Sequence, residues 1–417
     1  MERLPGFRDF YPEPLPPSEG WSAGVRRHIF EVWRGAAWRY GFREYDGPPL
    51  EPLELYTVKS GEEIVRQLYN FTDKGERAVA LRPEMTPTLA RMVAARERSY
   101  RKPIKWFAIP QLFRYEKQQK GRLREHFQFN ADIFGETSRG ADAELIALMI
   151  DALRGLGLGA EDFVVRLSSR DAWQEFYLNR GGTVGREDDF YQIIDKLERE
   201  DAAAGEARLR ELGIDPEAVR AFIAEARPTA ELQGMVEDLA ARGLGEFVRV
   251  DYRVVRGLAY YTGPVFEAFD RGGEFRAIAG GGRYDHLVRT VTGGKVDLPG
   301  LGFGMGDVVL TELLKARGKV PVLAEGLDVF VLIEEESSRW DSLRLVQRLR
   351  EAGRSVEYPM APAKSDKQFK RAIEQGAAHC CRLARASTGE FQAVLKNLKT
   401  REEKTLSLEA LVAQFGR

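Results

Sequence analysis

The spacing of apolar residues near the start of the chain predicts two amphipathic helices and short extended segments between them. Apolar residues recur at helical intervals over Pro17–Tyr40, before a turn. We expect an extended segment at 42–45 and a strand at Ala78–Arg82 that ends before a proline. Helical spacing then predicts a second helix from about Thr86 to Arg98.

Two extended segments rich in aromatic residues follow. The first covers 104–116 and is broken by Pro110, and the second covers 125–134. The polar residues Lys117–Arg122 separate them, so we predict an antiparallel pair joined by a basic loop. A helix is predicted next at 140–155, with a strand at Phe163–Leu167.

The composition becomes charged and helical over about 180–242, which predicts an inserted helical unit. Its charges are expected to lie on solvated helix faces. Strand patterns return at Phe247–Val254 and Val265–Phe269. Two glycine-rich blocks, 277–282 and 300–306, complete this part of the chain.

The last hundred residues alternate between strands and helices, as in a small α/β domain. We therefore predict a first domain over 1–320, a linker at 321–327 and an α/β domain at 328–417. Its predicted elements are strands at 328–333, 355–360, 379–384 and 391–396 and helices at 337–352 and 364–375.

Length, charge and cysteine content narrow the classes of function. A chain of 417 residues is too long for one typical domain, and a net charge of −1 gives no overall positive field, although a local basic face is enough for nucleic acid. Cys380 and Cys381 are adjacent in a predicted strand, so we expect buried free thiols and a reducing compartment. Residues 1–20 lack the apolar core of a signal peptide and no apolar run reaches membrane-spanning length, so we expect a cytoplasmic protein.

The predicted strand pair is the strongest candidate for chemistry, because polar residues alternate along it. Arg114 and Glu116 would share one face of the first strand. Arginine binds phosphate through two hydrogen bonds, and a nearby carboxylate can orient it or bind a substrate ammonium. A solvated sheet face with paired charges is the less favoured alternative. The polar residues on the return side are Arg122, Arg124, His126, Gln128, Asn130 and Asp132.

Two further segments are only suggestive by themselves. Glu84 and Thr86 follow the strand that ends before a proline, where they could simply be a first-turn acid and a helix cap. Arg256 lies at a turn before Tyr260 and Tyr261, where an arginine can be a loop charge and two tyrosines are more often core residues.

Several classes of site have no support in the sequence. The glycine blocks 277–285 and 299–307 match neither a P-loop nor a dinucleotide-binding fingerprint, and their glycines could mark a bulge or close packing. The four histidines show no metal-ligand spacing, so we expect no metal held by protein side chains. The sequence contains no GxSxG, which argues against a serine hydrolase.

Taken in order, these segments resemble a class II aminoacyl-tRNA synthetase, and within that class the histidyl-tRNA synthetase family. The resemblance covers nearly the whole chain, and the ordered set is more specific than any one motif. It implies an α+β catalytic domain on an antiparallel sheet with the helical insertion, and a C-terminal α/β anticodon-binding domain. The segments are GFRDFYPE at 6–13, ALRPEMTPTLARM at 80–92, FRYEKQQKGRLREHFQFNADIFG at 113–135, VRGLAYYTGPVFE at 255–267, AIAGGGRYD at 277–285, PGLGFGMGD at 299–307 and KSDKQFKRAIEQGA at 364–377.

The resemblance implies that histidine is activated by ATP, with Mg²⁺ brought by ATP, and then transferred to tRNA(His). Arg114 would contact the adenylate phosphate, with Glu116 and Arg122 completing the ATP site. His126 would lie where the adenine platform belongs. Arg256 would lie across the reacting carboxylate and the α-phosphate, so Arg114 and Arg256 are the implied catalytic residues.

The resemblance also implies where histidine and tRNA bind. The residues around histidine would be Glu84, Thr86, Gln128, Asp132, Arg256, Tyr260 and Tyr261. The loop Lys117–Gly121, with Gln118, Gln119 and Lys120, would reach the acceptor end of the tRNA. Lys367, Lys370 and Arg371 share a helix face that could contact the anticodon or be an ordinary solvated face. The segment Pro17–Pro52 resembles a dimer-forming motif, which implies a homodimer.

Departures from the family pattern keep a second interpretation open. Val309 stands where an arginine usually grips the ATP γ-phosphate, and Ala259 stands where an acid is usual. His126 and Phe127 are exchanged in order, and Asp132 replaces a glutamate. A divergent subgroup that includes organellar-type enzymes shares GLAYYTG and this GD-containing motif. The main alternative is a catalytically silent paralogue that acts as a regulatory subunit or senses tRNA or histidine, and a synthetase for another amino acid is weaker.

Overall fold

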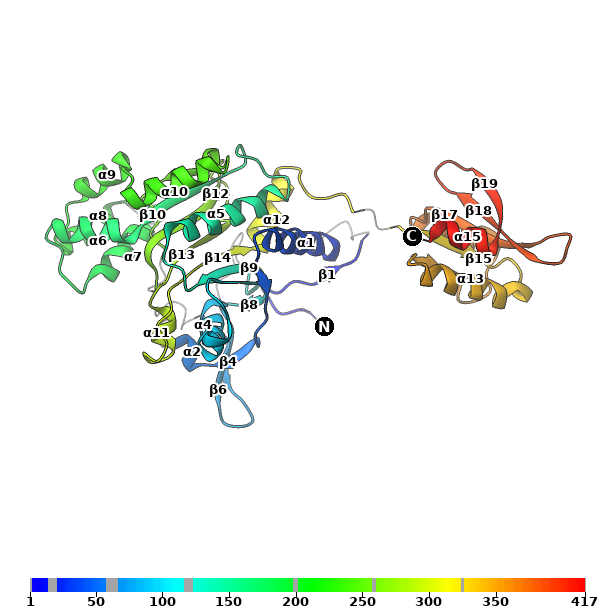
Figure 1. The fold of residues 1–417 in the computed structure, drawn as a ribbon, viewed down its shortest axis with the longest axis horizontal. Coiled ribbons are helices and arrows are strands. Elements are labelled where there is room, and N and C mark those ends of the chain that lie inside the picture. Colours follow the sequence, from blue (N-terminus) through cyan, green and yellow to red (C-terminus); the bar gives the residue numbers. More distant parts are fainter. Residues whose placement is uncertain are drawn as a thin grey trace. The chain divides into compact units, whose positions relative to one another are not determined.

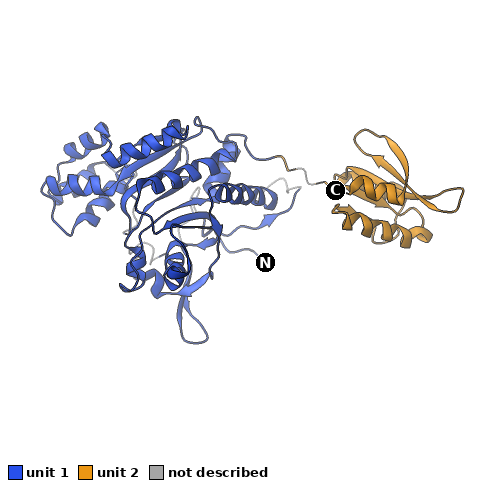
Figure 2. Cartoon of the chain, viewed as in Figure 1, with its two compact units in different colours: residues 1–321 blue, residues 322–417 orange. Residues whose placement is uncertain are grey.

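The computed structural model describes residues 2–13, 21–57, 67–115, 123–197, 202–256, 260–323 and 326–416. The chain divides into two compact units, Met1–Pro321 and Val322–Arg417 (Figure 2). In the described ranges, no helix is both long enough and apolar enough to cross a membrane.

A nine-stranded sheet forms the centre of unit 1. Its strands are β3 (Arg43–Glu44), β7 (Ile104–Ala108), β8 (Gln111–Phe113), β9 (Glu125–Phe134), β10 (Phe163–Ser169), β11 (Val248–Val250), β12 (Thr262–Asp270), β13 (Ala279–Arg283) and β14 (Gly300–Gly306). The order is β11-β10-β12-β13-β14-β9-β7-β3, with β8 paired to β9; Figure 1 labels β10, β12, β13, β14, β9 and β8. Only β10–β11 and β3–β7 are parallel, so the predicted antiparallel pair is confirmed.

Aromatic packing joins the sheet to the helices on one of its faces. Helices α1 (Ala23–Arg39) and α5 (Arg139–Arg154) pack on each other and on β9 (Figure 1). Trp33 of α1 stacks on Phe129 of β9, with 5.6 Å between ring centroids, and Phe129 meets Phe303 of β14 at 5.3 Å. These large buried side chains fix the position of β9 and β14, whose other face carries the candidate site.

The first helix begins later than its apolar pattern predicts. Trp21–Ser22 form strand β2, which pairs with β1 (Phe10–Tyr11), and residues 17–20 lie outside the described residues. The Ser22 side chain accepts a hydrogen bond from the Val25 amide at 2.9 Å. This bond satisfies a free helix-end amide, so the helix starts at Ala23.

A second layer of short elements carries Glu84 and Thr86. The small antiparallel sheet is β4 (Leu50–Pro52), β6 (Ala78–Leu81) and β5 (Asn70–Thr72), with α2 (Glu54–Thr57) beside it. Helix α4 runs over Thr86–Arg96, followed by the 3₁₀ turn Glu97–Ser99. The predicted helix is confirmed. Thr86 is its first residue and not its cap, because Met85 holds the cap position, without a side-chain hydrogen bond.

The inserted unit is helical, as its composition predicts. The helices within 180–242 are α7 (Glu187–Lys196), α8 (Ala202–Glu211), α9 (Pro216–Glu225) and α10 (Ala230–Ala241), and α6 (Arg170–Asn179) precedes them. Trp173 of α6 packs on Phe190 of α7 and Phe222 of α9, and its Nε1 donates to the carbonyl of Tyr252 at 2.9 Å. Pairs such as Arg210 and Glu206 are on the surface, as expected for solvated helix faces.

Unit 2 is a five-stranded mixed sheet with helices. Its elements are β15 (Val329–Leu332), α13 (Arg339–Glu351), β16 (Val356–Glu357), α14 (Ser365–Glu374), β17 (His379–Arg385), β18 (Phe391–Asn397), β19 (Glu403–Ser407) and α15 (Leu408–Phe415). The strand order is β16-β15-β17-β18-β19. Cys380 and Cys381 are buried and free, as predicted. The sequence patterns missed β19 and α15, and the strand predicted at 355–360 has only two residues.

Candidate active site

The candidate site lies over glycines of two adjacent strands. Gly280 of β13 pairs with Gly304 of β14, and Gly282 pairs with Gly302. A Cβ on Gly302 would overlap a carboxylate oxygen of Asp132, and a Cβ on Gly280 would overlap the guanidinium of Arg256. Because these glycines have no side chains, the sheet surface is hollowed here into a trough, and polar groups from neighbouring strands lie over it.

The β9 side of the trough carries the alternating residues predicted from the sequence. Gln128 lies over Gly304, where a Cβ would be 2.6 Å from the amide carbon of its side chain. Asp132 pairs in register with Gly302, and Asn130 with Gly304. Because cross-strand partners share a face, one side of the sheet holds all three polar residues.

Asp132 is a buried acid with one oxygen still available. Its side chain accepts a hydrogen bond from the Tyr284 hydroxyl through Oδ1, whereas Oδ2 has no partner among the described residues. Burial raises the pKa of Asp132 from 3.8 to about 7. A buried acceptor without a partner suits a ligand that offers an N–H group.

A second acid–tyrosine pair lies next to the first. The Tyr260 hydroxyl donates to Oε2 of Glu84 at 2.9 Å, and Glu84 is buried. The rings of Tyr260 and Tyr284 meet edge to face with centroids 5.9 Å apart, and Tyr261 packs on Tyr260 at 5.0 Å. Burial raises the pKa of Tyr260, so this hydroxyl stays protonated and donates.

Arg256 enters the trough from the β12 side. It forms an ion pair with Glu267 of β12, which pairs in register with Gly280. Its guanidinium carbon is 5.7 Å from the ring centroid of Tyr261. Its backbone is left-handed, with a φ of 61°, a conformation that residues other than glycine rarely adopt.

Arg114 lies near the Glu84 turn, but not in a strand as predicted. Strand β8 ends at Phe113, so the expected alternation of Arg114 with Glu116 within a strand is wrong for Arg114. Its Nε donates to the carbonyl of Pro83 at 2.9 Å, which places it beside the segment that carries Glu84. Arg124 likewise lies outside the strand in which it was predicted, because β9 begins at the next residue, Glu125.

His126 is uncharged at neutral pH. It lies on β9 opposite Leu112. Removal from water, with smaller contributions from the positive charges of Arg114 and Arg8, lowers its pKa to about 3. Phe127 points to the other face, where it packs on Phe30 at 5.2 Å. His126 is therefore the ring of this pair that faces away from the helices, as the register of Gln128 and Asp132 predicts.

Several predicted residues fall elsewhere. Glu116, Gln118, Gln119, Lys120 and Arg122 lie outside the described residues. Lys367, Lys370 and Arg371 are exposed on α14 of unit 2, where Lys370 is 3.8 Å from Glu374 and Arg371 is 3.9 Å from Glu357.

Sequence reasoning missed two partners in the trough. Tyr284 lies in the segment 277–285 and Glu267 in the segment 255–267, but neither the residue pattern nor the resemblance predicts a role for them. Glu267 faces Gly280 of the neighbouring strand β13, and an acid opposite a glycine is a pattern that could have pointed to Glu267. No local pattern could show that Tyr284 reaches Asp132, which is 152 positions away.

Comparison with known proteins shows the family of the chain. The family profile described as "Histidyl-tRNA synthetase" matches residues 13–306. The chain belongs to the histidyl-tRNA synthetase family. A histidine–tRNA ligase of Opitutus terrae is 43% identical, with 100% of this chain and 98% of that protein covered. A chloroplastic/mitochondrial histidine–tRNA ligase of Arabidopsis thaliana is 35% identical, with coverage of 97% and 85%. The crystal structure of histidyl-tRNA synthetase from Nostoc sp. PCC 7120 superposes with a TM-score of 0.75 at 23% identity, covering 96% of this chain and 99% of that one.

The predicted family, fold class and ligase class are thus confirmed. The structure also shows the surroundings of Val309, where the resemblance implies an arginine. Val309 is half-buried on α12 (Asp307–Ala316). Beside it, buried Asp307 binds Nη1 of Arg8 at 2.8 Å, while Glu125 binds Nε of Arg8 at 2.6 Å. Asp307 also accepts from the Phe127 amide at 2.9 Å. This cluster ties the N-terminal segment to β9 and α12 and engages both ends of the Arg8 guanidinium.

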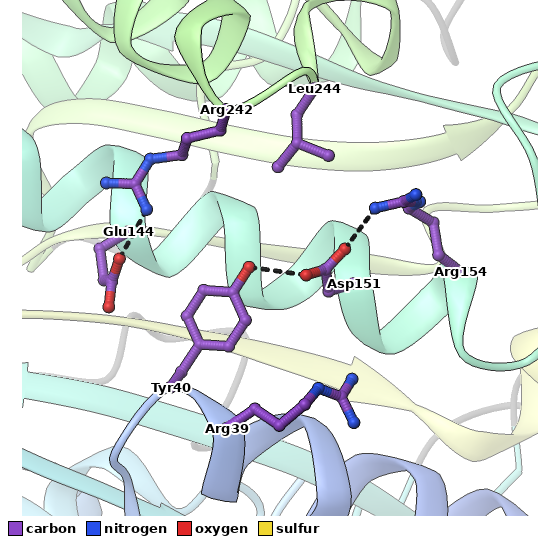
Figure 3. A pocket seen from close by; sticks show the side chains of 7 residues that line it. All are labelled: Arg39, Tyr40, Glu144, Asp151, Arg154, Arg242 and Leu244. Carbon is purple, nitrogen blue, oxygen red and sulfur yellow. Dashed lines mark hydrogen bonds and ion pairs between the residues drawn. The ribbon is translucent and has the colours of Figure 1, made fainter.

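A polar hollow of about 330 Å³ lies elsewhere in unit 1, and Figure 3 shows the residues that line it. Four of its charged side chains pair with one another, Glu144 with Arg242 and Asp151 with Arg154. None of its lining residues belongs to the trough. They are Arg39, Tyr40, Glu144, Asp151, Arg154, Arg242 and Leu244.

Proposed function

We propose that this chain, a histidine–tRNA ligase by family, forms histidyl-adenylate in the glycine-floored trough and then transfers histidine to tRNA(His). The observation that carries the proposal is the adjacent pair of buried acids, Glu84 and Asp132, each holding a tyrosine hydroxyl. Histidine carries two nitrogen-bearing groups, an α-ammonium and an imidazole. Two separate buried acceptors suit those two groups.

In this proposal Glu84 binds the α-ammonium and Asp132 accepts from the imidazole. Gln128 and Thr86 line the same pocket, and Tyr260 and Tyr261 pack near the ring. Recognition by buried polar groups gives strong selectivity, because a side chain that lacks the matching group leaves a buried partner unpaired, at a cost of about 1–3 kcal/mol.

The arginines act on the phosphate. A carboxylate oxygen of histidine attacks the α-phosphorus of ATP, the bond to pyrophosphate breaks, and the acyl-adenylate forms. Arg256 from the β12 side and Arg114 from the β8–β9 side neutralise the two anions and align them. Mg²⁺ carried by ATP supplies further positive charge to the phosphates, and Glu116, Arg122 and His126 are proposed on the ATP side.

Transfer follows by attack of a ribose hydroxyl at the tRNA end on the adenylate carbonyl, with release of AMP. This route requires no nucleophilic side chain. We place the acceptor end near Lys117–Gly121 and the anticodon at the basic face of α14. A homodimer through Pro17–Pro52 and a cytoplasmic location complete the proposal.

A silent regulatory paralogue is the second candidate, and Val309 favours it. Arg114 and Arg256 are retained and unit 2 is present, which favours the ligase. Charging of a tRNA(His) transcript with labelled histidine separates the two. Histidine that appears on the tRNA only when ATP is present supports the proposal. A folded protein that binds histidine but leaves every tRNA uncharged would support the regulator.

A further inference from the structure

Arg170 is a buried arginine outside the trough, at the junction of β10 and α6. Its guanidinium donates to three backbone carbonyls. These belong to Arg256 at 2.8 Å, Tyr261 at 3.3 Å and Val255 at 3.4 Å. Because buried carbonyls require partners, this one side chain satisfies acceptors on both flanks of residues 257–259.

The flanks that Arg170 joins carry three residues of the proposed site. Arg256 lies on one side, and Tyr260 and Tyr261 lie on the other. A left-handed backbone at Arg256 is unfavourable for a residue with a side chain and persists only when its surroundings hold it. The bond from Arg170 to the carbonyl of Arg256 acts directly on that strained residue.

Helix α7 of the inserted helical unit also contacts this arginine. The Tyr191 ring of α7 lies 4.6 Å from the guanidinium carbon of Arg170, and the Tyr191 hydroxyl donates to the Arg170 carbonyl at 3.4 Å. Arg170 therefore links the insertion to the segment that carries Arg256.

We infer that Arg170 is a positioning residue for histidine activation, which acts by fixing the backbone of Arg256 and Tyr261. The inference rests on the role proposed for Arg256. A point-charge ammonium cannot reach three carbonyls in the fixed geometry of a guanidinium, so lysine is expected to replace Arg170 only in part.

The test uses the full-length enzyme and histidine-dependent ATP–pyrophosphate exchange. Arg170→Met is expected to lower kcat and kcat/KM together by about 10- to 100-fold, since a small misplacement of a transition-state group has that effect. Arg170→Lys should fall between Arg170→Met and the natural chain. The matched control is Arg271→Met, because Arg271 also donates to backbone carbonyls, including that of Glu246 at 3.0 Å, away from the trough. It should leave kcat unchanged.

A double-mutant cycle separates positioning from general loss of structure. If Arg170 acts through Arg256, adding Arg170→Met to Arg256→Lys should lower kcat by a smaller factor than in the natural chain. Equal factors in both backgrounds would overturn the inference, as would normal kcat in Arg170→Met. If Arg256→Ala itself kept full exchange activity, the proposed role of Arg256 would fail first, so the two failures are distinguishable.

Discussion

Replacing Asp132 with asparagine should weaken histidine binding. The Asp132 carboxylate is 1% exposed and has one oxygen without a partner among the described residues. A hydrogen bond to a charged group contributes about 1.5–3 kcal/mol, and each 1.4 kcal/mol is about a factor of ten. Asp132→Asn is therefore expected to raise the KM for histidine about 10- to 100-fold and to leave the KM for ATP largely unchanged.

The same substitution should stabilise the protein without ligand, most strongly at alkaline pH. Burial raises the pKa of Asp132 from 3.8 to about 7, so the stability of the natural chain falls as pH rises through this window. At about 1.4 kcal/mol per pH unit, burial of the ionised Asp132 carboxylate costs about 4 kcal/mol of stability at pH 8. Asparagine removes this cost, but its own unpaired amide group costs about 1–3 kcal/mol. The gain from asparagine should be about 2 kcal/mol larger at pH 8 than at pH 5.5.

Pyrophosphate-exchange kinetics and thermal midpoints at the two pH values measure both effects. Asp142→Asn is the control, because Asp142 is also buried but pairs with Arg283. It should keep the KM for histidine, because Asp142 lies outside the proposed histidine pocket. An Asp132→Asn variant with a normal KM for histidine, or with the same change in stability at both pH values, would refute the reasoning.

Three further predictions follow from the trough, the buried cluster and unit 2. Gly302→Ala should lower histidine-dependent exchange at least about tenfold, since its Cβ would displace Asp132, whereas Gly306→Ala, with nothing within 4 Å of its Cβ, should be nearly normal in the same assay. Arg8→Met should cost about 3–5 kcal/mol of stability, because Asp307 and Glu125 would then be buried without the cation that pairs with them. A small change in the denaturation midpoint would contradict this. Charge reversal of the three basic residues of α14 should raise the KM for tRNA and leave pyrophosphate exchange intact, and equal loss in both assays would argue against an anticodon role.

The sequence predicted best those features that depend on local periodicity. Alternation along 125–134 placed Gln128, Asn130 and Asp132 on one face, because side chains in a strand repeat every two residues. The same reasoning failed at Arg114, since apolar spacing does not show where hydrogen bonding to a partner strand ends. The start of the first helix also depended on a specific cap, Ser22, which periodicity does not detect.

Partners that are distant in sequence could not be predicted from local patterns. Glu84 meets Tyr260 across 176 positions, and Arg170 reaches the carbonyl of Arg256 across 86. Such contacts arise only when the sheet is assembled. Resemblance to a family supplied the expected roles of the residues that would contact ATP, histidine or tRNA. It gave no role to Arg170, which donates to backbone carbonyls and would contact none of these substrates.

The most direct test of the proposed chemistry is ATP–pyrophosphate exchange with each standard amino acid, with Arg256→Ala as the control. We predict exchange with histidine alone and its loss in the control, which would also show that Val309 is compatible with activation. The absence of exchange with every amino acid, in a folded protein that binds histidine, would contradict the proposal and favour a regulatory or sensing paralogue.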